Sequence, residues 1–136
     1  MEWLSIRKTL SYSEIEHLEK ELKIKLPEDY KNLIGAINGG ALKNAYITHP
    51  ILGEVAYSRN VSLSRDARTN IFELIPIINH GDLRYFPFGS VGNGDYFCFD
   101  LQQKMIVLYV HERMETRDVC KTFTQLMNMI QQDGIN

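Results

Sequence analysis

The sequence has few cysteines, no surplus of charge of either sign and no long apolar run. Cys98 and Cys120 lack Cys-x-x-Cys spacing and are too few for a disulfide framework, so we expect two buried, reduced thiols. Fifteen Lys and Arg residues against 17 Asp and Glu give a net charge of −2, which attracts neither a phosphate backbone nor an anionic membrane. No segment approaches the roughly 20 apolar residues of a membrane helix, and no basic stretch with an apolar run opens the chain. These absences predict a cytoplasmic protein that binds neither nucleic acid nor membranes.

Sites for metal ions and phosphate groups are missing as well. No histidine has a second ligand at the i+2 or i+4 spacing that directs two donors to one metal; the histidines are His17, His49, His80 and His111. The glycine-rich run 89–94 lacks the Lys-Ser/Thr of a phosphate loop and precedes a strand-like segment, which favours a turn capped by Asp95. The sequence therefore predicts no metal and no cofactor.

Catalytic chemistry has only weak support. A carboxylate can orient an imidazole for acid–base work, and the sequence offers His80 with Asp82 and His111 with Glu112. No nucleophile motif accompanies either pair, so structural or surface histidines are the preferred interpretation. Cys98 with His111 is a weak thiol pair, since Cys98 lies in an apolar run where a thiolate is disfavoured. A small hydrolase stays the last alternative, and no catalytic residue is predicted.

The composition is that of an ordinary folded domain. The chain has 136 residues, of which 44% are hydrophobic and 24% charged, so we expect one domain over residues 1–136. Residues 11–22 carry apolar side chains at helical spacing behind a Ser11–Glu14 capping box, which predicts a first helix. Pro27 fits the first turn of a second helix.

The second helix is predicted to end at Asn38-Gly39-Gly40. Its apolar stripe recurs every three or four residues and consists of Tyr30, Leu33, Ile34 and Ile37. Asn and Gly tolerate the left-handed backbone of a helix C-cap. We therefore expect a positive φ at Gly39 or Gly40.

The second half of the chain predicts an antiparallel sheet. Apolar and aromatic runs separated by turn residues predict strands over 74–79, 84–91, 96–101 and 105–110. Their short separations favour a meander, because parallel crossovers need a dozen or more residues. Alternation in the third strand predicts one better-buried face, and the fourth strand, apolar on both faces, is predicted to lie inside the sheet.

Two further segments complete the predicted fold. Residues 41–73 predict a loop with one short strand and one short helix. A third helix is predicted from Asp118, with an apolar stripe of Val119, Phe123, Leu126, Met127 and Ile130. The sequence thus predicts an α+β fold in which a mainly antiparallel sheet packs against an N-terminal helix pair and a C-terminal helix.

Short motifs follow one another along nearly the whole chain. The first half carries Leu18-Glu19, Leu26-Pro27-Glu28-Asp29-Tyr30 and Asn38-Gly39-Gly40. The second half carries Phe86-Pro87-Phe88-Gly89, Gly94-Asp95, Asp100, Val107, His111-Glu112 and Phe123. With these motifs the chain resembles the SUKH superfamily, which unites yeast-type cell-wall assembly regulators with bacterial toxin-immunity proteins. Residues 43–73 match no motif of that superfamily.

The resemblance implies protein binding and not catalysis. In a bacterium it implies an immunity protein that neutralises a cognate polymorphic toxin, often a nuclease, while the eukaryotic members imply a regulatory scaffold as the alternative. Physical chemistry assigns most motif residues to the fold, because Pro27 starts a helix, Gly39 and Gly40 turn the chain, and Tyr30 and Phe88 are core aromatics.

The partner is predicted to bind the loops at the strand ends. Polar side chains that the apolar core does not require gather around these turns: Asp82, Arg84, Asn93, Asp95 and His111. Strand-end loops often carry recognition, and Tyr85 and Tyr96 are anchors of the type enriched in interface hot spots. We expect the segment 59–68 to flank this surface. The alternative is that both tyrosines pack under a helix.

An acidic group near the first two helices offers a second possible interface. Its members are Glu14, Glu16, Glu19, Glu21, Glu28 and Asp29. Nearby lysines make a solvated face of mixed charge the simpler interpretation. Complementarity to a basic partner is the functional alternative.

Overall fold

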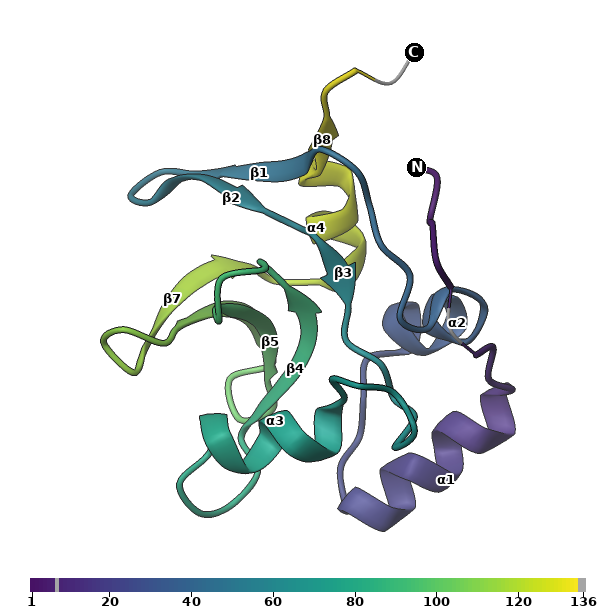
Figure 1. The fold of residues 1–136 in the computed structure, drawn as a ribbon. Helices are drawn as coiled ribbons and strands as arrows, with labels where there is room; N and C mark the ends of the chain where they lie inside the picture. Colours follow the sequence, from purple (N-terminus) through teal and green to yellow (C-terminus); the bar gives the residue numbers. More distant parts are fainter. Residues whose placement is uncertain (7, 135–136) are drawn as a thin grey trace.

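The computed structural model describes residues 1–6 and 8–134, which form helices packed against two antiparallel sheets (Figure 1). The helices are α1 (Tyr12–Leu22), α2 (Glu28–Ile37), α3 (Ile71–Ile78) and α4 (Phe123–Met129). The strands are β1 (Ala45–His49), β2 (Gly53–Ala56), β3 (Arg59–Asn60), β4 (Tyr85–Ser90), β5 (Tyr96–Asp100), β6 (Met105–Val110), β7 (Glu115–Cys120) and β8 (Gln131–Gln132). The predicted α+β class is confirmed.

The larger sheet contains three of the four strands predicted for the meander, namely β4, β5 and β6. Its order is β3-β4-β5-β6-β7, and every neighbouring pair is antiparallel. β6 pairs on both sides, as expected of a strand inside a sheet. The smaller sheet has the order β2-β1-β8, so the C-terminal strand pairs with a hairpin far away in sequence.

The two N-terminal helices form where the sequence predicts them. The Ser11 hydroxyl accepts the N–H of Glu14 at 3.1 Å, and the Glu14 carboxylate accepts the N–H of Ser11 at 3.0 Å, which is the predicted capping box. α2 begins directly after Pro27. Leu33 was predicted to belong to the apolar stripe of α2, but this assignment is wrong because its side chain is 38% exposed. Lys31 is buried instead because it finds an ionic partner, Glu19, on α1.

The predicted glycine C-cap is confirmed at Gly39, whose φ is +71°. Around this bend the Asn38 side chain joins distant segments. Its amide donates to Lys8 O at 2.9 Å, and its carbonyl accepts the N–H of Leu63 at 2.8 Å. The Asn-Gly-Gly motif therefore sets the direction of the chain after α2 and fixes the loop that follows β3.

Replacing Gly39 by valine is expected to lower the free energy of unfolding by about 1–2 kcal/mol, because a β-branched residue is strained at this φ. Asn tolerates left-handed backbone better, so Gly39→Asn is expected to lose less. Urea unfolding of both variants measures the difference. Equal losses, or no loss in the valine variant, would show that backbone strain is not what selects glycine.

The predicted strand over 74–79 is wrong, because this segment belongs to helix α3. The Asn70 side chain caps the helix by accepting the N–H of Phe72 at 2.9 Å and of Glu73 at 3.2 Å. Ile71, Leu74 and Ile78 then fall on one buried face. The helix lies beside β4 (Figure 1). Tertiary burial and a strong cap thus outweigh Pro76, which lies inside the helix.

The predicted start of the C-terminal helix is also wrong. Asp118 and Val119 belong to β7, which forms the edge of the larger sheet, and α4 begins only after Thr122. The Thr122 hydroxyl accepts the N–H of Gln125 at 3.0 Å and defines that start. The segment 41–73 holds more strand than expected, since it contains the β1–β2 hairpin and β3.

The core has aromatic rings at its centre. Tyr30 of α2 lies within 5.0 Å of Phe99 and 5.3 Å of Phe123, measured between ring centroids, and Phe88 stacks on Phe99 at 4.2 Å. Both faces of β5 are buried, which corrects the expectation of one better-buried face.

The two thiols are free and buried, as predicted. Burial raises the pKa of Cys98 far above its ordinary value and that of Cys120 to about 11. Both cysteines therefore act as small core residues, and Cys98 cannot serve as the thiolate of a pair with His111.

Candidate functional site

At one end of the larger sheet, Asp95 and His111 tie two turns together. An Asp95 oxygen accepts the backbone N–H of His111 at 3.0 Å and lies 2.6 Å from its Nδ1. Asn93 shapes the β4–β5 turn by accepting the N–H of Asp95 at 3.0 Å. Gly94 has a φ of +98°, and a Cβ added there would lie 3.1 Å from the His111 ring, so both the backbone and this close approach favour glycine. His111 pairs with Asp95 across the sheet, and not with its neighbour Glu112 as the acid–base hypothesis supposed.

The predicted binding residues do not form one surface. Register places Tyr85 opposite Asp100 and Ser90 opposite Tyr96, so Arg84 and Asp95 lie at opposite ends of the sheet. One predicted group therefore comprises Asn93, Asp95, Tyr96 and His111, and the other comprises Asp82, Arg84 and Tyr85. Strand-end residues of a meander alternate between the two ends, and this is the physical reason for the split.

Arg84 and Asp100 form an ion pair at the other end of the larger sheet. The guanidinium donates to Asp100 through Nε at 3.1 Å and Nη2 at 3.0 Å, and the carboxylate is 2% exposed. Asp100 also accepts the N–H groups of Gln102 and Gln103 in the β5–β6 turn. Burial tends to raise the pKa of Asp100, but Arg84 and these two N–H groups hold it below its ordinary value. The ion pair and the two hydrogen bonds from the turn together hold the chain between β5 and β6 in place.

Tyr85 and Tyr96 are half-buried, so each ring packs partly on the core and is partly accessible to a partner. The Arg84 guanidinium lies 5.0 Å from the centre of the Tyr85 ring. Tyr96 lines a groove of about 340 Å³ together with Gly94, Arg59 and Arg68. The segment 59–68 thus flanks the Asp95–His111 end of the sheet, in the position that the sequence predicted.

The other predicted acid–base pair, His80 with Asp82, does not assemble. Both residues are exposed, and no ion pair joins them within the described part of the chain. His49 is buried, and its Nδ1 accepts the N–H groups of Ile51 and Leu52 at 3.1 and 3.2 Å. Its Nε2 therefore carries the proton and donates to Asp118 O at 3.0 Å. This imidazole joins the β1–β2 hairpin to β7.

The N-terminal acidic group is largely occupied within the fold. Glu19 is buried against Lys31 at 2.8 Å and accepts the N–H of Leu26 at 2.7 Å. Asp29 accepts both the N–H and the hydroxyl of Thr124, at 2.9 and 3.0 Å. Glu14 belongs to the capping box of α1. Few of these carboxylates remain for a basic partner.

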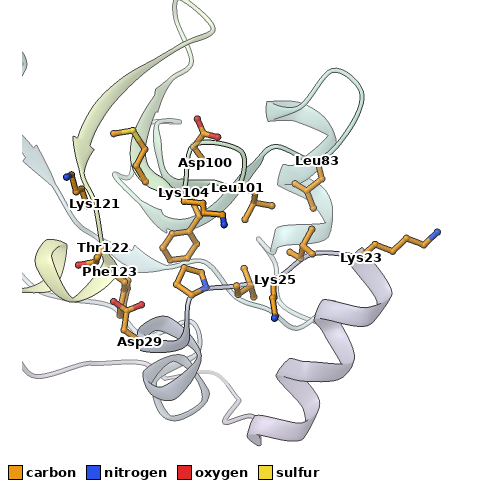
Figure 2. Close-up of a pocket in the computed structure, with 15 residues that line it drawn as sticks. Lys23, Lys25, Asp29, Leu83, Asp100, Leu101, Lys104, Lys121, Thr122 and Phe123 are labelled. Carbon is orange, nitrogen blue, oxygen red and sulfur yellow. The ribbon is translucent and has the colours of Figure 1, made fainter.

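A groove that sequence analysis missed lies where three segments meet (Figure 2). It measures about 610 Å³, and it is lined by the α1–α2 linker with the start of α2, by the β5–β6 turn, by the β7–α4 junction and by Leu83. Lys25, Lys104 and Lys121 stand around it on these three segments, whereas Lys23 extends away from it. Residues so far apart in sequence carry no common local signal.

Comparison with known proteins now adds to this geometry. The model of the SMI1 / KNR4 family (SUKH-1) matches residues 9–129. The chain belongs to this family. The match extends through residues 43–73, where the sequence offered no motif. No curated protein and no solved structure gave a match.

The geometry separates the SUKH motif residues of this chain by what each one does. Glu19, Asn38 and Asp100 satisfy buried backbone groups, and Tyr30 and Phe88 fill the core. Gly94 and Asp95 allow the turn-to-turn contact with His111. Within the described part of this SUKH-1 chain, every helix is too short or too polar to span a bilayer.

Proposed function

We propose that this SUKH-1 protein is a non-enzymatic protein-binding module that acts in the cytoplasm as an immunity protein and neutralises a cognate polymorphic toxin. The observation that carries the proposal is how the reactive side chains are used. Cys98 has a strongly raised pKa, His49 has both ring nitrogens engaged, and the Asp100 carboxylate is held by Arg84. The imidazole–carboxylate pair that remains partly exposed, His111 with Asp95, ties two turns together, which suits recognition better than chemistry.

The Asp95–His111 end of the sheet is the surface we propose for toxin contact. Its turns are fixed by the hydrogen bonds of Asn93 and Asp95, so little ordering is needed when a partner binds. Tyr96 offers a half-buried aromatic ring, and the exposed Arg68 lines the same groove. Aromatic and Arg side chains in such a rigid setting are the usual anchors of an interface.

The proposal is tested by sequencing the neighbourhood of the gene and co-expressing the protein with a toxin domain found there. The parent protein is expected to restore growth and to form a stable complex with that domain. The folded double variant Tyr96→Ala/Arg68→Glu is expected to weaken binding by at least about tenfold, since hot-spot truncations cost about 2 kcal/mol or more.

The exposed Lys20 of α1 provides the control, and Lys20→Glu is expected to protect as well as the parent. A parent protein that neither binds the toxin nor restores growth would overturn the proposed function. Full protection by the folded double variant would leave the function standing and remove the proposed surface.

A further inference from the structure

The groove of Figure 2, here called the lysine groove, has an apolar floor. Leu26, Phe99 and Phe123 line it and are almost fully buried. Leu83 and Leu101 line it and are only half-buried, so apolar surface faces solvent there. A groove with an apolar floor accommodates an apolar side chain of a ligand.

The rim of the lysine groove is positive. Lys25, Lys104 and Lys121 are exposed, and within residues 1–6 and 8–134 none of them forms an ion pair with a carboxylate. This local excess of positive charge stands out because the whole chain carries a net charge of −2.

The carboxylates that line the lysine groove do not neutralise this rim. Asp100 is 2% exposed and is paired with Arg84. Asp29 is turned to α4, where it accepts the N–H and hydroxyl of Thr124. Glu28 lies close enough to Lys25 to interact with it, but its carboxylate is hydrogen-bonded to Tyr12. The three ammonium groups thus surround an apolar floor without forming an ion pair among the described residues, and an anionic ligand would complement them.

We infer that the lysine groove docks an acidic peptide segment of the partner protein, in which Asp or Glu residues flank one apolar side chain. The apolar side chain lies on the floor at Leu101 and Leu83, and the flanking carboxylates meet Lys25, Lys104 and Lys121. A phosphate backbone would use the lysines but would leave the apolar floor empty, which favours a peptide. The inference rests on the proposed function in one respect only, namely that the partner is a protein.

The lysine groove lies at the opposite end of the sheet from Asp95 and His111. Asp100 ends β5 and Leu101 begins the β5–β6 turn, whereas Asp95 and His111 belong to the β4–β5 and β6–β7 turns. A single partner would therefore have to contact two separate surfaces. Charges at the rim of such a contact mainly raise the association rate and make it depend on salt.

Two-dimensional NMR with defined probes tests the lysine groove without any toxin. The first probe is a synthetic 12-residue peptide of Glu and Asp around a central Leu; the second replaces its acids by Gln and Asn; the third is a 12-nucleotide oligothymidylate. At low salt we expect the amide signals of Leu83, Leu101, Lys104 and Lys121 to shift with the acidic peptide alone. The shifts are expected to shrink as salt is added.

Matched charge-reversal variants complete this test. Lys104→Glu/Lys121→Glu is expected to abolish the shifts, whereas Lys20→Glu/Lys43→Glu, which makes the same charge change at exposed lysines elsewhere, is expected to keep them. Thermal melts check that both variants fold. Absence of groove shifts with the acidic peptide, equal shifts with the neutral one, or tighter binding of the oligonucleotide would overturn the inference.

The second part of the test measures how fast the protein associates with the toxin domain. Lys104→Glu/Lys121→Glu is expected to slow association with the toxin domain about tenfold at low salt, and the control variant is expected to leave it unchanged. If the parent protein does not bind the toxin, the proposed immunity function is wrong, but the NMR evidence for peptide binding in the lysine groove is unaffected. A toxin complex that forms equally fast with both variants overturns the docking inference and leaves the proposed function intact.

Discussion

Tyr30→Ala is expected to lower the free energy of unfolding by about 4 kcal/mol, the range found when large buried aromatic side chains are truncated. The Tyr30 side chain is fully buried, and its ring lies within 5.0–6.3 Å of four phenylalanine rings: Phe86, Phe88, Phe99 and Phe123. These rings come from β4, β5 and α4. A cavity at this position would loosen helices and sheet together, and equilibrium unfolding in urea measures the loss.

Tyr30→Phe is expected to leave stability unchanged or to raise it by about 1 kcal/mol, because a buried hydroxyl without a partner carries a desolvation cost. The Tyr30 hydroxyl forms no hydrogen bond with the described residues, and burial raises its pKa far above the ordinary value. The phenylalanine variant keeps the ring contacts and removes only the hydroxyl. A loss above about 1 kcal/mol in this variant would show that the hydroxyl is bonded in solution.

The parts of the fold that the sequence predicted are those with strong local signals. The Ser11–Glu14 capping box, the Pro27 start and the glycine at residue 39 each specify a backbone state within a few residues. The strands of the meander were predictable because aromatic and β-branched runs alternate with turn residues.

The errors arose where an overlooked cap competed with an apolar run. Asn70 followed by Glu73, and Thr122 followed by Gln125, both have the spacing of helix N-termini, and both mark the true starts of α3 and α4. The run after Asn70 is apolar on nearly every position, so periodicity alone could not distinguish helix from strand. β7 was missed because an edge strand rich in charge resembles the start of an amphipathic helix.

The candidate surfaces were less predictable than the fold. Sequence analysis found Asp95 and His111, but it could not show that Arg84 lies at the other end of the sheet. The lysine groove joins residues 25, 104 and 121, whose proximity is created only by tertiary packing. The composition gave no indication of the lysine groove, because a small net negative charge of the whole chain does not reveal a local excess of positive charge.

Glu19→Ala is expected to lower the free energy of unfolding by about 3–4 kcal/mol, since breaking a buried ion pair leaves an uncompensated charge. Glu19 and Lys31 are 8% and 6% exposed, and their charged atoms lie 2.8 Å apart. The alanine variant leaves the Lys31 ammonium with only Glu28, at 3.4 Å, and with the Tyr12 ring, 4.7 Å away. It also deprives the Leu26 N–H of its acceptor. Urea unfolding at pH 7 measures the loss.

The double variant Glu19→Leu/Lys31→Met separates the ion pair from the packing around it. Replacing both charges by apolar side chains removes the desolvation cost together with the attraction, so the double variant is expected to lose about 2 kcal/mol less than the sum of the single variants Glu19→Leu and Lys31→Met. Additive losses would show that the two side chains do not stabilise each other. The Leu26 N–H remains without an acceptor in the double variant, which keeps its stability below that of the parent.

The pH dependence gives a further test of the same pair. The hydrogen bond with Glu19 is the main reason why the pKa of Lys31 is raised above its ordinary 10.5. A group with a raised folded-state pKa contributes its full stability below the unfolded-state pKa and loses it only as pH rises through the folded-state value. The parent is therefore expected to keep the full contribution of Lys31 at about pH 6 and at about pH 9, since both values lie well below the ordinary pKa of lysine. In Glu19→Ala the buried ammonium lacks this partner and burial favours its neutral form, so the stability lost in the variant is expected to be smaller at about pH 9 than at about pH 6. Equal losses at the two pH values would show that Lys31 keeps its proton without Glu19.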